Sequence, residues 1–332
     1  MPNRQILIAE LPQGKLTADH FRLTETDMPK PGAGEVLCRT LLLSLDPANR
    51  AWMQGATYRS ALEPGQVMAG FCLAEVVESN DPRFKPGDIV EGDGGWQDYF
   101  VKPARGLNRR ERREPLSHLM SVLGVTGRTA YVGMAGIGRP QAGDTVVVSA
   151  AAGATGSVAG QIAKLNGARV IGIAGGAEKC RRIVDEFGFD AAIDYKSENL
   201  FQALKQTCPE GIDLYFDNVG GTTLEAVLFR MNLHGRIVCC GVVSQYDTDA
   251  PAAGPRGVPG LLVTKRLAMT GFIVGDDPVL VARADRDLPR WLDEGRLEVA
   301  EDVVEGLENA PAGLVGLLAG ENFGKRMVRV SA

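Results

Sequence analysis

The feature that most constrains the fold is a strand-like run at residues 145–148 that leads directly into the small-residue stretch AAAGATGS. A near-continuous β-branched run is typical of a strand buried on both faces of a parallel sheet. The stretch gives A-x-x-G-x-x-G from Ala150 through Gly153 to Gly156, and we expect a helix to begin at Ser157. Small residues let the backbone turn tightly and approach a pyrophosphate. A simple tight turn is the alternative, but the flanking strand and helix favour nucleotide binding.

The residues around this loop predict the architecture of the second half of the chain. From Asp144 onward, strand-like runs alternate with helix-length amphipathic segments. This alternation requires right-handed crossovers and gives a parallel sheet with helices on both faces. We therefore predict an α/β fold with a doubly wound, Rossmann-type domain at residues 121–299.

The first 120 residues have a different texture, because short apolar segments are broken repeatedly by Pro and Gly. This pattern predicts a β-rich domain with many turns. A chain of 332 residues also exceeds what one core usually holds, so two domains are expected. The strand-helix-strand pattern at about 300–332 has no place in a complete six-stranded sheet, and we expect it to complete the first domain.

The end of the second predicted strand indicates which dinucleotide is bound. An NAD site places an acidic residue there to hold the ribose hydroxyls, whereas this strand ends in Ala174, Gly175 and Gly176. The glycines leave room for a 2′-phosphate, and Lys179 can reach it. The sequence therefore predicts NADPH, with a solvated helix face as the alternative explanation of the lysine. Asn218 follows the strand IDLYFD at the edge where parallel sheets bind ligands, although it is also a common turn residue.

Charge and hydropathy exclude several classes of partner. A net charge of −5 gives no attraction to phosphate backbones, and the basic run at 105–113 contains Glu111, as a solvated face would. We expect no nucleic-acid partner. No apolar stretch reaches the roughly 20 residues of a membrane span, and the six cysteines are scattered. We expect no membrane partner and a cytoplasmic location.

Metal-ligand spacing is also missing from the first 120 residues. They offer His20, Cys38, Cys72 and His118, and none of these lies at the spacing of a zinc site. We expect no metal, so simple alcohol oxidation would lack its usual Lewis acid.

Several ordered motifs support a family resemblance over essentially the whole chain. They are AAAGATGSVAGQIAKLNGARVIGIAGGAEKC, GFD, YFDNVGG, CGVVSQY and GLENAP, preceded by KPGDIV, WQDY and LGVTGRTAY. Together they resemble the zinc-independent medium-chain dehydrogenase/reductase superfamily, and within it the prostaglandin, alkenal double-bond and bacterial curcumin reductases.

That resemblance implies a GroES-like domain, formed by the N-terminal part and the C-terminal tail, with NADPH in a cleft between the two domains. It implies that the glycine loop holds the pyrophosphate and that Lys179 and Tyr195 hold the adenosine phosphate end. The cofactor-binding residues implied by the family are Gly153, Ala154, Thr155, Gly156, Lys179, Tyr195, Asn218, Cys240, Gly241, Val242, Ser244, Tyr246, Phe272, Ile273, Val274 and Asn322.

The resemblance also places a tyrosine at Tyr246, in the long loop at residues 242–260, which would suit a lid. Hydride addition to the β-carbon of an unsaturated carbonyl builds negative charge on the oxygen, and a positioned hydroxyl stabilises that charge or relays a proton. We predict this catalytic role for Tyr246. A hydrogen bond from Tyr246 to the cofactor ribose alone is the alternative.

The sequence departs from the group where the usual Asp-Pro-Tyr-Met-Arg stretch has Ala48 and Asn49 in place of Tyr and Met. If that tyrosine walls the pocket, this pocket is wider or more polar. We predict substrate contacts from Arg50 and Tyr58, although aromatic residues of a β-rich domain more often lie in its core.

These observations predict an NADPH-dependent reductase of the carbon-carbon double bond of α,β-unsaturated ketones or aldehydes. A homodimer is expected from the family alone. Two alternatives remain open at this stage. One is a quinone oxidoreductase with the same cofactor site, and the other is a structural protein that binds NADPH without turnover.

Overall fold

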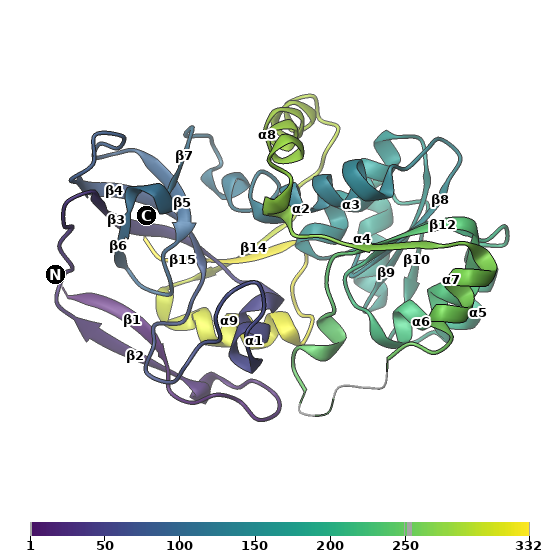
Figure 1. Ribbon diagram of the computed structural model, residues 1–332, viewed down its shortest axis with the longest axis horizontal. Helices are drawn as coiled ribbons and strands as arrows, with labels where there is room; N and C mark the ends of the chain where they lie inside the picture. Colours follow the sequence, from purple (N-terminus) through teal and green to yellow (C-terminus); the bar gives the residue numbers. More distant parts are fainter. Residues whose placement is uncertain (1, 249, 251–253, 332) are drawn as a thin grey trace. The chain divides into compact units, whose positions relative to one another are not determined.

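The computed structural model describes residues 2–248, 250 and 254–331, so four positions of the predicted lid loop (249 and 251–253) lie outside the described residues. The chain divides into two compact units, and each is described separately (Figure 1). Unit 1 contains residues 1–120, 246–250 and 301–332. Unit 2 contains residues 121–245 and 251–300.

Unit 2 is built on a six-stranded sheet with the strand order β10-β9-β8-β11-β12-β13, and each pair of neighbouring strands is parallel. This order is that of a doubly wound dinucleotide-binding sheet. Its strands are β8 (Thr145–Ser149), β9 (Arg169–Ala174), β10 (Ala191–Asp194), β11 (Ile212–Asp217), β12 (Met231–Cys239) and β13 (Ala268–Gly271).

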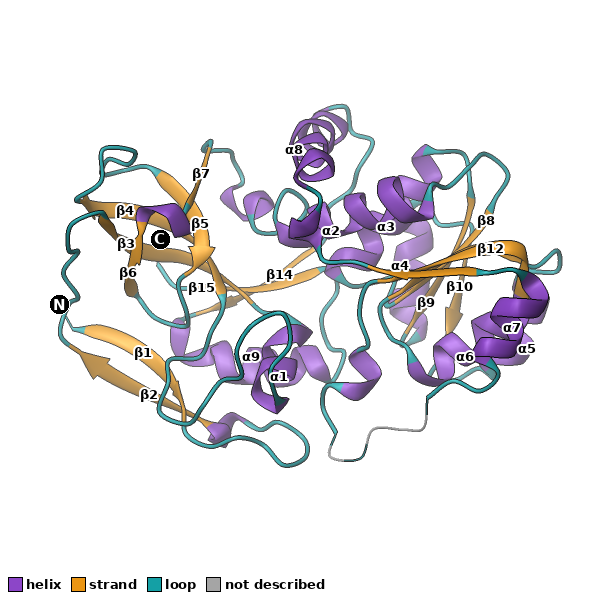
Figure 2. Ribbon diagram, viewed as in Figure 1, coloured by secondary structure: helices purple, strands orange, loops and turns teal. Residues whose placement is uncertain are grey.

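Two groups of helices cover this sheet (Figure 2). In one group α2, α3 and α4 contact one another in turn, and α8 packs on α2. In the other group α6 contacts both α5 and α7. The helices are α2 (Val125–Val132), α3 (Ala154–Leu165), α4 (Ala177–Phe187), α5 (Leu200–Thr207), α6 (Gly221–Arg230), α7 (Val258–Lys265) and α8 (Pro278–Asp293).

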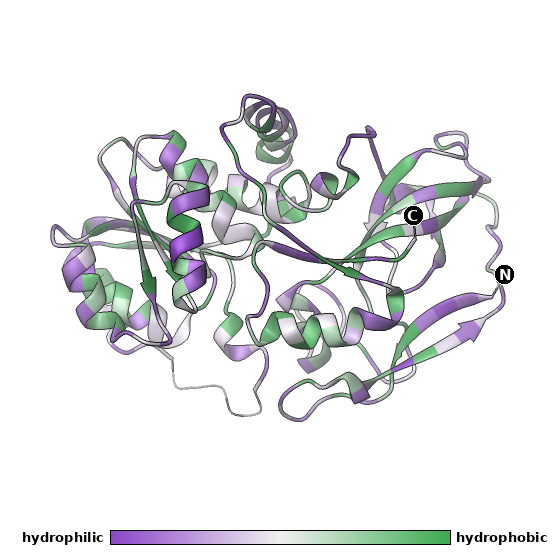
Figure 3. Ribbon diagram, turned by 180° about the vertical axis from the view of Figure 1, so that it is seen from behind, coloured by the Kyte–Doolittle hydropathy of each residue, from purple (hydrophilic) through white to green (hydrophobic). Residues whose placement is uncertain are grey.

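The burial of unit 2 follows its hydrophobic pattern. Val146, Val147 and Val148 of β8 are all fully buried, as expected for a strand covered on both faces. Figure 3 shows hydrophobic residues concentrated on the strands and hydrophilic residues recurring along the helices. Local capping also fixes helix starts, since the side chain of Asn199 accepts from the N–H of Gln202 at 3.1 Å where α5 begins.

Unit 1 is β-rich. Its larger sheet has the order β14-β15-β3-β4-β5-β7, with β6 paired to β3, and a separate hairpin pairs β1 with β2. Its strands are β1 (Asn3–Ile8), β2 (Phe21–Thr26), β3 (Glu35–Ser44), β4 (Phe71–Ser79), β5 (Ile89–Asp93), β6 (Tyr99–Pro103), β7 (Asn108–Arg110), β14 (Glu301–Glu305) and β15 (Lys325–Arg329). Its α-helices are α1 (Pro47–Gln54) and α9 (Ala310–Leu318).

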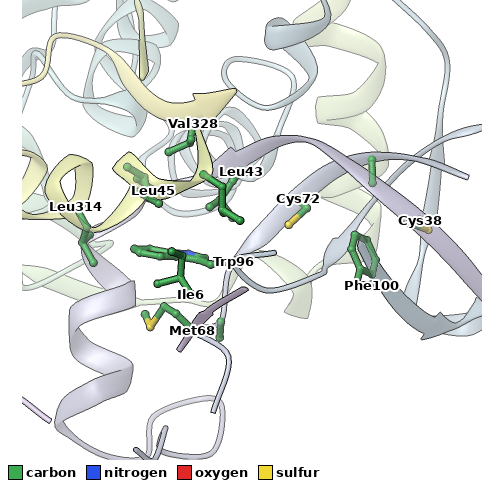
Figure 4. Close-up of a cluster of buried hydrophobic side chains, with 14 of the residues drawn as sticks. Ile6, Cys38, Leu43, Leu45, Met68, Cys72, Trp96, Phe100, Leu314 and Val328 are labelled. Atoms are coloured by element: carbon green, nitrogen blue, oxygen red, sulfur yellow. The ribbon is translucent and has the colours of Figure 1, made fainter. Parts of the chain in front are cut away.

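The core of unit 1 joins the two ends of the chain. Trp96 is fully buried, lies in one cluster with Ile6, Leu45 and Leu314 (Figure 4), and stacks on Phe21 with ring centroids 5.3 Å apart. Burial of such side chains contributes about 1.5–3 kcal/mol each. The C-terminal segment is therefore part of this core.

An ion pair between a buried lysine and a partly exposed aspartate also holds the C-terminal segment in unit 1. The ammonium of Lys325, only 2% exposed, donates to the carbonyl oxygen of Leu45 at 2.8 Å and to Asp46 Oδ1 at 2.7 Å. Strand β15 also pairs with β14 on one side and with β3 on the other.

These observations confirm the predicted fold class, a Rossmann-type parallel sheet together with a β-rich unit. One local boundary was wrong, because α3 begins at Ala154 rather than at Ser157. The glycine-rich residues form the first turn of the helix, since Gly153 is its N-cap. No helix among the described residues combines the length and the hydropathy needed to span a bilayer.

Candidate functional site

The turn between β8 and α3 is shaped by one close approach of the backbone. A Cβ atom on Gly156 would lie 2.3 Å from the carbonyl oxygen of Ala150, so only glycine fits there. Ala150 itself has φ 48°, a left-handed conformation that residues with a side chain rarely adopt. The chain thus accepts local strain in order to turn sharply from strand to helix.

Gly153 differs from Gly156 in what surrounds it. A Cβ on Gly153 would meet only the carbonyl oxygen of Ala150 within 4 Å, at 3.2 Å, and its φ of −91° is open to any residue. Packing within the protein therefore demands glycine less strictly at this position than at Gly156. The first-turn N–H groups of Ala154 and Thr155 have no acceptor within the helix, as at any helix start. The turn can present backbone donors to an anion without a side chain in the way.

A second group of predicted residues lies where β9 and β10 end. A Cβ on Gly175 would lie 2.9 Å from atoms of both Tyr195 and Lys196, so these two side chains lie across the glycine. Tyr195 is half exposed. Lys179 lies near the start of α4, which begins just after Gly176. Lys196 is not among the residues predicted from the sequence, although it follows Tyr195 directly.

The acidic residue at the end of β10 is bound to the backbone. Asp194 Oδ1 accepts from the N–H of Gly176 at 2.7 Å and from the N–H of Lys196 at 3.0 Å. The hydrogen bond from Gly176 is the main reason that the pKa of Asp194 lies below its ordinary value. Asp194 thereby fixes the glycine turn that precedes α4.

A buried polar network fixes Asn218 at the end of β11. The backbone N–H of Asn218 donates to Ser149 Oγ at 2.9 Å, and its side-chain amide donates to the carbonyl oxygen of Ser149 at 2.7 Å. Asp217 accepts from the Tyr215 hydroxyl at 2.8 Å and from the N–H of Gly220 at 2.8 Å. Burial raises the pKa of Asp217, and these hydrogen bonds act against that rise. Sequence reasoning missed Ser149 and Asp217, because a polar residue ending a strand carries no specific signal.

Hydrogen bonds join the loop after β12 to the loop after β11. The N–H groups of Cys240 and Gly241 both donate to the carbonyl oxygen of Asp217, at 2.8 and 3.1 Å. Ser244 donates to the carbonyl oxygen of Val219 through its N–H and its hydroxyl, at 3.1 and 2.6 Å. A Cβ on Gly220 would come within 2.8 Å of Val242. Burial raises the pKa of the Cys240 thiol to about 12, so it remains a neutral thiol.

The remaining predicted residues at this edge form the stretch from Phe272 to Val274, which directly follows β13. A Cβ on Gly133 would lie 2.9 Å from the Phe272 ring, and Ile273 is 44% exposed. The parallel sheet thus brings to one edge every predicted cofactor residue from Gly153 to Ser244, together with this stretch.

Four predicted residues belong to unit 1 instead: Arg50, Tyr58, Tyr246 and Asn322. Arg50 is 1% exposed and enclosed by protein. The buried side-chain amide of Asn322 donates to the carbonyl oxygen of Gly324 at 2.8 Å.

Tyr58 lies close enough to Asp46 and Tyr246 for its pKa to respond to both. The Tyr58 ring packs edge-on against Trp52, with centroids 6.3 Å apart, and remains 64% exposed. Partial desolvation of its hydroxyl raises the pKa of Tyr58, and Asp46 and Tyr246 raise it further. Trp52 lies in the core of unit 1, whereas Tyr58 is exposed.

Two family models match the chain. One, described as the N-terminal domain of oxidoreductase, matches residues 4–109, and one described as zinc-binding dehydrogenase matches residues 154–288. The NADPH-dependent curcumin reductase of Escherichia coli is 42% identical over 335 residues, which cover 99% of this chain and 97% of the relative. The chain belongs to the medium-chain dehydrogenase/reductase family.

Other members of this family are similar over most of their length. The NADP-dependent 2-alkenal reductase of Nicotiana tabacum is 42% identical, covering 90% of this chain and 88% of the relative. Mouse prostaglandin reductase 1 is 40% identical and covers 96% of both chains. The structure of CurA from Vibrio vulnificus in complex with NADPH matches with a TM-score of 0.94 at 42% identity, covering 99% of each chain. The predicted family resemblance is confirmed.

The description of the second family model names zinc. Across residues 2–248, 250 and 254–331, no group of three or more His, Cys, Asp or Glu side chains is arranged to hold a metal ion.

The contrast between the two glycines gives a test. We expect Gly153→Val to weaken dinucleotide binding by roughly a hundredfold or more, because its side chain blocks charge-assisted contacts of about 1.5–3 kcal/mol each. Its melting temperature should stay close to that of the unchanged protein. Gly156→Val should instead destabilise unit 2, because its Cβ would overlap Ala150. Calorimetric titration measures dinucleotide affinity, and thermal melts measure stability. An equal loss of stability in the two variants would contradict the assignment of Gly153 to dinucleotide binding.

Proposed function

We propose that this protein reduces the carbon-carbon double bond of α,β-unsaturated ketones or aldehydes with NADPH and without a metal. The observation that carries the proposal is the match over nearly the whole chain, at 38–42% identity, to relatives named curcumin, 2-alkenal, (+)-pulegone and prostaglandin reductase. The glycine turn at Gly153 and the Tyr195 and Lys196 side chains beside Gly175 support the cofactor. In this proposal the segment 121–299, most of which belongs to unit 2, binds NADPH, and unit 1 binds the substrate.

The residues at the edge of the parallel sheet fit a dinucleotide phosphate. Bound NADPH supplies the hydride that adds to the β-carbon of the substrate. The backbone donors from Gly153 to Gly156 hold the pyrophosphate, and Asn218 with the loop from Cys240 to Ser244 shapes the site beyond it. We propose that Lys179, Tyr195 and Lys196 contact the 2′-phosphate. The last two side chains lie beside Gly175. Phe272, Ile273, Val274 and Asn322 are proposed as further contacts.

The lysine assignment predicts a selective effect on the cofactor. Lys179→Ala should raise the Michaelis constant for NADPH roughly ten- to a hundredfold, as expected for one lost charge-assisted hydrogen bond, and barely change that for NADH. Lys205→Ala, which removes an exposed lysine from the last turn of α5, serves as the control. Steady-state kinetics with both cofactors measure this difference. An equal rise in the Michaelis constants for NADPH and NADH would rule out the assignment of Lys179 to the 2′-phosphate.

Tyr246 is the proposed catalytic residue. After hydride addition the carbonyl oxygen carries negative charge, and the Tyr246 hydroxyl stabilises that enolate and relays the proton that completes the reduction. We propose that the exposed Tyr58 contacts the substrate. Both tyrosines belong to unit 1.

Tyr246→Phe removes only the hydroxyl. We expect the turnover number to fall by about a hundredfold, since proton transfer by a positioned group contributes of this order, while NADPH affinity changes little. Stopped-flow hydride transfer and fluorescence titration separate the two quantities. An unchanged turnover number would mean that solvent or a cofactor hydroxyl supplies the proton.

The experiment that tests the function is a screen of 2-alkenals, enones and quinones with NADPH, with the products analysed by mass. A gain of two hydrogens across the carbon-carbon double bond is the expected result. Quinone reduction without enone reduction would favour the alternative activity, although the quinone oxidoreductase structures that match at 22% identity or less show only the shared fold. Tight NADPH binding with no turnover on any acceptor would indicate a structural protein.

We further propose a cytoplasmic homodimer. Strand β13 ends the parallel sheet, pairs with β12 alone among the described strands, and is largely exposed, which supports pairing with the same strand of a second copy. The six free cysteines support a reducing compartment. Sedimentation equilibrium should give twice the mass of the chain, and a monomer would rule out the dimer.

A further inference from the structure

Arg50 is an unusual residue to find in the interior of unit 1. Its side chain is 1% exposed and lies in α1. Nε donates to Asp247 Oδ1 at 3.2 Å, and Nη2 donates to the carbonyl oxygen of Gly14 at 2.7 Å. Nη1 is buried and has no hydrogen-bond acceptor among the described residues.

Stability alone does not account for this arginine. Removing a guanidinium from water costs several kcal/mol, and one nitrogen without an acceptor leaves part of that cost uncompensated. An apolar side chain of similar volume often stabilises such a site equally well or better. The planar guanidinium instead offers several N–H donors in a rigid arrangement, and this arrangement defines where its acceptors lie.

Those acceptors belong to two separate segments of the chain. Asp247 Oδ1 accepts from Arg50 and also from the backbone N–H of Leu16, at 2.7 Å. Gln54 lies one helical turn after Arg50 on the same face of α1, and its amide donates to the carbonyl oxygen of Thr248 at 3.4 Å. Residues 247 and 248 are therefore held against α1 at two points.

We propose that Arg50 is a positioning residue, and that its bond to Asp247 fixes the orientation of the adjacent Tyr246 for proton delivery. This inference rests on the proposed function and assigns Arg50 a role other than direct substrate contact. Side chains displaced by about 1 Å from their reactive geometry lose of the order of a hundredfold in rate. The bond thus controls the turnover number rather than cofactor affinity.

The test compares turnover numbers and NADPH affinities of variants of the full-length protein. Arg50→Met and Asp247→Ala should each lower the turnover number roughly ten- to a hundredfold and leave NADPH affinity unchanged. Asp247→Asn keeps an oxygen that accepts from Arg50 and Leu16, so it should retain most of the activity. Should Arg50→Met not fold, the partly exposed Asp247 provides the same test.

Arg326→Met is the matched control. Arg326 is 11% exposed in unit 1 and also donates to a carboxylate and a backbone carbonyl, those of Asp302 and Gly313. Among the described residues its side chain bonds to Asp302, Gly313 and Glu321 and not to residues 246–248. Its loss should therefore reduce stability without lowering the turnover number of the folded protein. If Arg50→Met behaved like Arg326→Met, the positioning role would be disproved.

A double-mutant cycle with Tyr246→Phe tests the route of the effect. If Arg50 acts through Tyr246, adding Asp247→Ala to Tyr246→Phe should lower the turnover number by less than twofold further. Full additivity would overturn the proposal, as would a Tyr246→Phe variant with normal turnover. Failure of the proposed function is a separate outcome, because the unchanged protein would then reduce no enone at all.

Discussion

The close approach of Gly156 to the carbonyl oxygen of Ala150 is the constraint on which the functional half of the molecule depends. It forces the chain from strand to helix within a few residues, so that α3 begins at Ala154, directly after its N-cap Gly153, and its free N–H groups follow the end of β8. Ala150 accepts a left-handed conformation to make this possible. Because the neighbouring strands are parallel, the residues that follow each of them lie at the same edge. A single tight turn thereby determines where a ligand can be bound by backbone groups from several strands.

Much of this arrangement could be predicted from the sequence because it depends on local patterns. The buried run of β8, the small residues after it and the alternation of strands and helices all act over short distances, and together they predict the Rossmann-type sheet. The start of α3 was missed because glycine is common both in loops and at the N-cap, so a run of Gly and Ala does not separate a loop from a first helical turn. The roles of the site residues themselves rest on the family and remain proposals.

The contacts that could not be predicted join residues far apart in the chain. Arg50 and Asp247 are both charged and would ordinarily be assigned to the surface, yet the arginine is buried and the two are separated by 197 positions. Ser149 and Asp217 are likewise 68 positions apart and meet only because β8 and β11 are neighbours in the sheet. Such pairs follow from topology, so no local pattern of residues identifies them. They also determine how firmly Asn218 and residues 247–248 are held.

The position of β15 has a consequence for biosynthesis. This strand lies between β14 and β3, so the sheet of unit 1 remains divided until residues 325–329 have been made. Unit 2 needs nothing beyond residue 300 and is complete earlier, although more than a hundred residues of unit 1 precede it. During translation the core residues of the N-terminal strands therefore lack their packing partners Leu307, Leu314 and Val328 until the last segment is made. Premature release of the chain a few residues short would leave a finished nucleotide-binding unit attached to an aggregation-prone partner.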